Sequence, residues 1–233
     1  PDPLIREHAA LLAAAAETVG DPAVRHLGTL GGSLAHADPA GDLPAVAVAL
    51  DAQLSVAGPG GTRTIPAREF FVDYLQTALA PDEVLTEIRV PKLTGWGVHY
   101  EKFQRVAQAW AVVGVAAAVR SSNGSIAEAR IGLTNMAPTP VRASAVEQAL
   151  AGGDRTRDAI TAAAAAAADG TAPTSDLSAQ ADYREHLARV LTGRAVATAA
   201  GLYAGRQSKG DHSGAEVCFY EVVGARSASD PAR

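Results

Sequence analysis

The chain contains, at residues 25–44, the stretch RHLGTLGGSLAHADPAGDLP. Its centre is the adjacent pair Gly31 and Gly32, and the hydroxyl residues Thr29 and Ser33 flank that pair. Adjacent glycines permit positive φ angles and lack Cβ atoms, so their backbone N–H groups can approach an anion closely. The stretch therefore predicts a tight loop whose N–H groups and hydroxyls face a phosphate.

Three polar residues follow within the same stretch: His36, Asp38 and Asp42. Pro39 and Pro44 stiffen the backbone that carries them. This combination suits the pyrophosphate and sugar hydroxyls of a dinucleotide. A Gly-Gly turn in an ordinary loop is the alternative; His36 would then cap a loop, and Asp42 would cap the following helix or turn. The ordered run of residue types favours the dinucleotide over the ordinary turn.

The run from Thr29 to Pro44 resembles the second flavin-binding segment of the FAD-binding (medium) subunits of molybdenum hydroxylases. That family includes carbon monoxide dehydrogenase medium subunits and the FAD subunit of xanthine dehydrogenase. The resemblance continues through four further stretches, at residues 80–91, 100–105, 137–142 and 182–187. Together these matches span most of the chain.

The resemblance implies an α+β fold in two domains. Residues 1–94 are expected to be the C-terminal part of a PCMH/VAO-type FAD-binding domain, its second subdomain, without the first. Residues 97–204 are expected to form a three-stranded antiparallel sheet with helices, as in the CO dehydrogenase flavoprotein C-terminal domain. Two glycines break the pattern between residues 92 and 97, which places the boundary there. Residues 205–233 lack periodicity and are expected to be an irregular tail, although residues 217–223 have the pattern of a strand.

The hydrophobic pattern predicts the secondary structure in more detail. A helix is expected over 4–18, and another over 68–76 with Phe70, Phe71 and Tyr74 on one side. The Asn123-Gly124 pair predicts a hairpin turn, because both residues tolerate positive φ. The remaining expected elements are a hairpin over 53–65, strands over 84–90, 98–105, 110–120 and 125–134, helices over 143–150 and 158–168, and a long helix from 177 or 181 to about 202.

Within the first domain, the resemblance assigns roles to the residues of the opening stretch. It implies that Thr29, Gly31, Gly32 and Ser33 hold a phosphate or the ribityl hydroxyls of FAD and that His36 lines the flavin site. Two further first-domain residues join them: the Asp42 carboxylate against flavin-side hydroxyls, and Leu85 as an apolar contact to the ring.

The second domain contributes two more residues to the implied flavin site. Lys102 resembles a family lysine that approaches the isoalloxazine ring, where a cation would stabilise the anionic reduced flavin. Trp110 stands where the family carries an aromatic residue that stacks on or shields the ring. Without the resemblance, Lys102 would be a solvated charge and Trp110 a core residue of the second sheet. Ala109 replaces an acidic residue common in relatives, so NAD use has no support.

The implied function is that of the flavoprotein subunit of a molybdenum-containing hydroxylase, with no residue of this chain acting on the organic substrate. FAD would relay electrons from the 2Fe-2S cluster of a small subunit to an external acceptor, and a large subunit would carry the molybdenum cofactor. The first flavin segment of the family has no counterpart in this sequence. We therefore expect FAD to be absent or substoichiometric and exposed apolar surface to favour self-association. A flavin-free scaffold or interaction subunit is the alternative function.

Composition narrows the remaining classes of protein. The net charge of −5 argues against nucleic acid as the main partner. No apolar run approaches the roughly 20 residues that span a bilayer. Cys218 is the only cysteine, which excludes an intrachain disulfide and an iron–sulfur cluster held by this chain. With no secretory signal before Leu4, the sequence predicts a cytoplasmic protein without a metal site.

Overall fold

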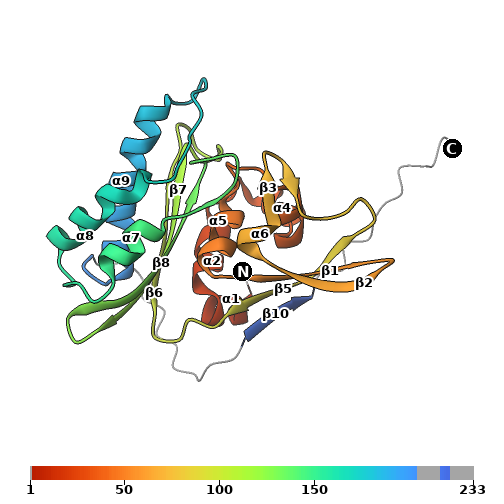
Figure 1. Cartoon of the computed structure of the whole chain (residues 1–233), viewed down its shortest axis with the longest axis horizontal. Coiled ribbons are helices and arrows are strands. Elements are labelled where there is room, and N and C mark those ends of the chain that lie inside the picture. The colour runs from red at the N-terminus through yellow and green to blue at the C-terminus, as the bar shows by residue number, and fades with distance from the viewer. Residues whose placement is uncertain (1, 204–215, 221–233) are drawn as a thin grey trace.

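The computed structural model describes residues 2–203 and 216–220. Two four-stranded sheets enclose a layer of helices, and a second group of helices covers the outer face of one sheet (Figure 1). The expected α+β class is confirmed, because antiparallel sheets and helices alternate in layers. Within the described residues, no helix combines the length and apolar character needed to cross a membrane.

The N-terminal region is helical. Its helices are α1 (Pro3–His8), α2 (Ala10–Glu17), α3 (Pro22–Leu27), α4 (Leu30–His36) and α5 (Asp42–Ala49). The single helix expected over 4–18 is wrong, because Ala9 leaves helical geometry with φ −134° and ψ 50° and separates α1 from α2. All eight residues of α5 are buried, whereas α3 buries none. Helix α5 is therefore part of the core, whereas α3 lies at the surface.

The first sheet follows these helices. It consists of β1 (Gln53–Gly58), β2 (Gly61–Pro66), β5 (Val84–Pro91) and β10 (Glu216–Tyr220), in the antiparallel order β10-β5-β1-β2. The hairpin and the strand over 84–90 were predicted correctly. The strand pattern noted over 217–223 appears in part as β10, which pairs with β5 from Glu216 against Pro91 to Tyr220 against Glu87, so residues 216–220 depart from the irregular tail that was expected. The rest of the tail lies outside the described residues.

The segment expected as a helix over 68–76 divides into three short elements: α6 (Ala67–Phe70), β3 (Phe71–Asp73) and β4 (Gln76–Thr77). Phe70 and Phe71 are both buried, with their rings edge to face at 5.3 Å, whereas Tyr74 is exposed. Leu75 has a φ of 53°, the left-handed geometry that turns β3 back into β4. Burial of two consecutive aromatic rings outweighs the helical pattern here.

The second sheet contains β6 (Gly97–Phe103), β7 (Val113–Ser122), β8 (Ser125–Thr134) and β9 (Val141–Arg142), in that order. The three long strands were expected, and the two-residue β9 adds a fourth beside β8. Asn123 and Gly124 form the predicted turn, with φ of 49° and 80°. Trp110 was expected in a strand, but β7 begins at Val113 and residues 104–112 form a loop.

Helices α7 (Ser144–Leu150), α8 (Arg157–Ala164) and α9 (Ala181–Ala199), with the 3₁₀ turn η1 (Ala165–Ala168), cover one face of this sheet (Figure 1). Helices α2 and α5 cover the other. Strand β7 is buried on both faces, since Val115 and Ala117 join the core under α9 while Ala116 joins the core with α5. Gly132 of β8 lies so close to α5 that a Cβ would stand 2.2 Å from the carbonyl oxygen of Ala45. The N-terminal region and the second sheet are therefore tightly packed.

Candidate functional site

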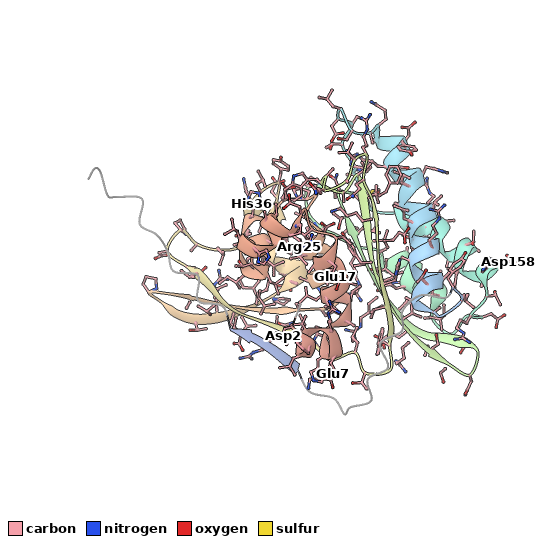
Figure 2. All side chains as sticks on the ribbon, turned by 180° about the vertical axis from the view of Figure 1, so that it is seen from behind. Asp2, Glu7, Glu17, Arg25, His36 and Asp158 are labelled. Atoms are coloured by element: carbon pink, nitrogen blue, oxygen red, sulfur yellow. The ribbon has the colours of Figure 1, made fainter. Side chains whose placement is uncertain are left out.

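A cleft of about 1240 Å³ opens between the N-terminal helices and the loop that follows β6. Six of the predicted site residues line it: Thr29, Gly32, Ser33, His36, Asp42 and Trp110. Figure 2 labels four points on its wall, Asp2, Glu17, Arg25 and His36, which gather on one face of the helical region, away from Asp158 on the outer helices. The structure thus brings the opening stretch and the second-domain aromatic to one cavity.

The glycine pair lies in a helix, which corrects the prediction of a tight loop. Thr29 is the N-cap of α4, with φ −124° and ψ 157°, and its hydroxyl oxygen accepts a hydrogen bond from the Gly32 N–H at 2.9 Å. Gly31 and Gly32 occupy the first turn that this cap starts. A Cβ on Gly32 would lie 2.8 Å from the Thr29 Oγ1, so glycine leaves room at the cleft wall.

The C-terminal end of α4 turns the chain toward Asp42. Ala37 ends the helix with a φ of 54°. His36 is exposed and lies 3.9 Å from the Asp38 carboxylate, while the other Asp38 oxygen accepts the Ala40 N–H at 2.8 Å. Asp38 thus holds the loop that leads to Asp42 at the start of α5.

Asp42 forms a buried ion pair with Lys102, which joins α5 to β6. The Lys102 Nζ donates to the Asp42 Oδ2 at 2.8 Å and to the Thr18 carbonyl oxygen at 3.1 Å. Only 5% of the Lys102 side chain and 3% of the Asp42 side chain are exposed. Burial raises the pKa of Asp42, and the hydrogen bonds from Lys102 and Tyr100 oppose that rise.

Tyr100 and Thr134 complete this network, although the sequence had not singled them out. The Tyr100 hydroxyl donates to the Asp42 Oδ1 at 2.6 Å and lies 3.3 Å from the Thr134 Oγ1. Burial, together with the Asp42 charge, raises the pKa of Tyr100 well above its ordinary value. The signal available in the sequence was the spacing of Tyr100 and Lys102, which places both on one face of a strand. Asp42 lines the cleft, and Tyr100, Lys102 and Thr134 form its network beneath the cleft surface; we call these four residues the cleft floor.

Three predicted site residues do not line the cleft: Gly31, Leu85 and Lys102. Gly31 is buried in α4. Leu85 is 5% exposed and packs in the core between β5 and the N-terminal helices. The Lys102 ammonium donates to Asp42 and Thr18, so in this structure its charge reaches the cleft through Asp42.

The opposite side of the cleft is more open. Trp110 is 60% exposed and faces the cleft from the loop between β6 and β7. On the helical side, Val24 and Leu27 of α3 line the cleft, and Leu27 is 88% exposed. We call α3 together with residues 29–33 the cleft rim.

The lining groups fit a dinucleotide such as FAD. The volume exceeds the roughly 300–1,000 Å³ typical of pockets for drug-sized ligands. The rim offers the hydroxyls of Thr29 and Ser33 and a wall opened by Gly32, and Trp110 offers an aromatic face. Among the described residues, no group of three or more His, Cys, Asp or Glu side chains is arranged to hold a metal ion.

Comparisons with known proteins agree with this arrangement. Residues 2–93 match the family described as FAD binding domain in molybdopterin dehydrogenase, and residues 98–199 match the CO dehydrogenase flavoprotein C-terminal domain. The carbon monoxide dehydrogenase medium chain of Hydrogenophaga pseudoflava is 41% identical over 197 residues, covering 83% of this chain and 68% of that protein. The nicotine 6-hydroxylase medium subunit of Paenarthrobacter nicotinovorans is 33% identical, covering 84% of this chain and 69% of that protein.

Solved structures give the same result. Carbon monoxide dehydrogenase from Hydrogenophaga pseudoflava matches with a TM-score of 0.83 and 43% identity, covering 86% of this chain and 70% of that chain. Quinoline 2-oxidoreductase from Pseudomonas putida 86 matches with a TM-score of 0.82 and 29% identity at the same coverage. The chain spans 65–69% of the length of three curated relatives. It belongs to the FAD-binding (medium) subunits of the molybdenum hydroxylases, a family of oxidoreductase subunits.

Proposed function

We propose that this chain holds FAD in the cleft and serves as the electron-relay subunit of a molybdenum hydroxylase. FAD, when bound, accepts electrons one at a time and releases two. The observation that supports the proposal is the cleft itself, which Thr29, Ser33 and Asp42 of the N-terminal region line together with Trp110. These are the residues that the family pattern assigns to the flavin.

Each lining residue has a role in the proposed site. The hydroxyls of Thr29 and Ser33 bind the phosphates or ribityl hydroxyls, and His36 lines the same wall. The Asp42 carboxylate accepts hydrogen bonds from hydroxyl groups of the flavin. Tyr100 and Lys102 of β6 donate to the same carboxylate and fix its orientation. Trp110 shields the ring from solvent.

Lys102 and Leu85 act from beneath the surface in the same proposal. Lys102 holds Asp42 in place, and its positive charge raises the potential at the cleft floor, which favours a more negative flavin. Leu85 supports α4 from the core instead of touching the ring.

The proposed assembly contains a small 2Fe-2S subunit that delivers electrons and a large subunit whose molybdenum cofactor oxidises the substrate. Relatives named as medium chains or subunits support this composition. The division into residues 1–94 and 97–204, a cytoplasmic location and self-association through exposed apolar side chains belong to the same proposal. The exposed Val24 and Leu27 of the rim support self-association.

A titration of FAD with the chain, followed by flavin fluorescence anisotropy, tests the proposal. We expect saturable but weak binding that stays below one FAD per chain at moderate FAD concentration, in line with the substoichiometric occupancy expected from the sequence. Ser33→Glu places a carboxylate in the cleft wall, and it should abolish binding while leaving α4 folded, because an acidic residue near a helix N-terminus is favourable. Ser122→Glu, on the exposed end of β7, is the matched control and should bind as the unmodified chain does. No saturable binding would favour the flavin-free scaffold, and equal binding by both variants would show that FAD binds outside this cleft.

A further inference from the structure

Asn135, directly after β8, contacts two parts of the cleft that lie far apart in the sequence. Its backbone N–H donates to the carbonyl oxygen of Pro39 at 2.8 Å. Its side-chain amide donates to the carbonyl oxygen of Ala111 at 2.8 Å and to that of Val112 at 3.4 Å. Pro39 precedes Asp42 by three residues, and Ala111 follows Trp110. Asn135 therefore joins the two walls of the cleft without lining it.

The backbone at Asn135 explains why one residue can reach both walls. Its φ of 62° is left-handed, a geometry that asparagine adopts more readily than most side chains. This conformation turns the chain out of β8, so that the backbone donor points to one wall and the side-chain donors to the other. Thr134, the preceding residue, contacts Tyr100 in the cleft floor, so the end of β8 contacts three cleft segments.

The loop that carries Trp110 has hydrogen bonds at several points: the Arg105 Nη1 donates to the Leu177 carbonyl oxygen at 2.8 Å, and the Ala109 N–H donates to the Val106 carbonyl oxygen at 3.3 Å within the loop. The Val112 N–H donates to the Phe103 carbonyl oxygen at 2.8 Å, and the buried Arg184 donates from Nη1 to the Val112 carbonyl oxygen at 2.5 Å. Residues 105–108 are exposed. The carbonyl oxygen of Ala111, the residue after Trp110, is thus bonded to a residue that also bonds to Pro39 on the helical side of the cleft.

We propose that Asn135 is a positioning residue that fixes Trp110 relative to the 39–42 segment and so sets the width of the flavin cleft. The proposal rests on the proposed function, because the cleft width matters for the isoalloxazine ring that Trp110 is to shield. It assigns the effect to the side-chain amide, since an aspartate would present a carboxylate to the Ala111 carbonyl and a glycine would present nothing.

The test uses Trp110 as its own reporter in the flavin-free chain. The chain has two tryptophans, and Trp96→Phe leaves Trp110 as the only one. Asn135→Gly tolerates the positive φ and keeps the N–H donor to Pro39, so it removes only the side-chain bonds. Asn123→Gly is the matched control, because Asn123 is also left-handed but lies in the distant β7–β8 turn. Asn135→Asp is the second variant and keeps the side-chain volume.

Time-resolved fluorescence anisotropy should show a larger nanosecond amplitude for Trp110 in Asn135→Gly and Asn135→Asp and no change in Asn123→Gly. Where FAD binds, its dissociation constant should rise by about three- to tenfold in the Asn135 variants, the effect of one lost hydrogen bond. Unchanged Trp110 motion, or an equal increase in Asn123→Gly, would overturn the proposal. If the unmodified chain bound no FAD while the anisotropy result held, the positioning role would stand and the proposed function would fail.

Discussion

The cleft floor and the cleft rim differ in how their polar groups are used. In the floor, the carboxylate of Asp42 accepts hydrogen bonds from Tyr100 and Lys102, and all three side chains are buried. In the rim, α3 buries no residue and the hydroxyl of Thr29 caps a helix at the open cleft. In the floor the charged groups bind each other and join α5 to β6, whereas in the rim the polar groups face the open cleft.

We therefore expect the floor to determine the stability of the fold and the rim to determine what the cleft binds. A change in the floor should destabilise the whole fold, because buried charges depend on their partners. A change in the rim should alter what the cleft binds while the core stays intact. Variants of each kind therefore distinguish the two regions.

Lys102→Met should have the largest effect. It leaves the Asp42 carboxylate buried without its cation, which costs about 3–5 kcal/mol when one partner of a buried pair is removed. Chemical denaturation monitored by circular dichroism measures the loss. The double variant Asp42→Asn with Lys102→Met removes both charges and should recover part of it; no recovery would show that the ion pair is not the cause.

The pH dependence of the same pair has a definite sign. Burial raises the pKa of Asp42, so the folded state binds this proton more tightly than the unfolded state. The contribution of protonation to stability is therefore complete below the unfolded pKa and is lost as pH rises through the folded pKa. The penalty of Lys102→Met should accordingly shrink as pH falls, which urea denaturation at several pH values measures. A penalty that grows as pH falls would contradict this account.

Gly132→Ala should destabilise next most strongly. Its Cβ would lie 2.2 Å from the Ala45 carbonyl oxygen, so β8 and α5 must separate, at a cost of about 1–3 kcal/mol or more. Gly32→Ala is the matched rim variant: its Cβ meets the movable Thr29 side chain, and alanine favours the helix by about 1 kcal/mol. Thermal unfolding should show a large shift for the first and little for the second; equal shifts would show that the buried contact between β8 and α5 tolerates an added Cβ no worse than the rim does.

Thr29→Ala should cost about 1 kcal/mol through the lost N-cap of α4. Thr29→Ser retains the capping oxygen and should be close to the unmodified chain in stability. FAD affinity measured on the same variants should fall in Thr29→Ala more than the stability change alone would produce. If only stability changed, Thr29 would be a cap without a binding role.

The smallest effect is expected at Glu83, which lies outside both regions. The exposed Arg63 holds the pKa of Glu83 at about 2, below its ordinary 4.5. Its stabilising contribution is present above the unfolded pKa and is lost as pH falls from about 4.5 to about 2. Glu83→Gln should therefore flatten the acid side of the stability profile slightly, opposite in sign to the Asp42 effect; a steeper acid side would contradict it.

Local signals made much of the fold predictable. The Asn123-Gly124 turn sets the hairpin of β7 and β8 because its geometry depends on those two residues. The expected helix over 68–76 failed because burial of Phe70 and Phe71 depends on partners elsewhere in the fold. The tail strand depends likewise on an available edge of β5.

The site was predictable where a contiguous stretch forms it. Thr29, Ser33 and Asp42 come from one run of residues, and all line the cleft. The glycine pair alone could not distinguish a loop from the first turn of α4, because a helix forms here only when Thr29 caps its N-terminus. The bonds from Tyr100 to Asp42 and from Asn135 to Ala111 join residues that only the folded chain brings together.

The central claim is that the cleft holds FAD with its ring against Trp110, and the time-resolved fluorescence of bound flavin tests it most directly. A tryptophan in contact with the ring quenches the flavin excited state by electron transfer. The FAD-loaded chain should show a strongly shortened flavin lifetime that lengthens in Trp110→Phe and stays short in Trp96→Phe. A lifetime unaffected by Trp110→Phe would contradict the claim.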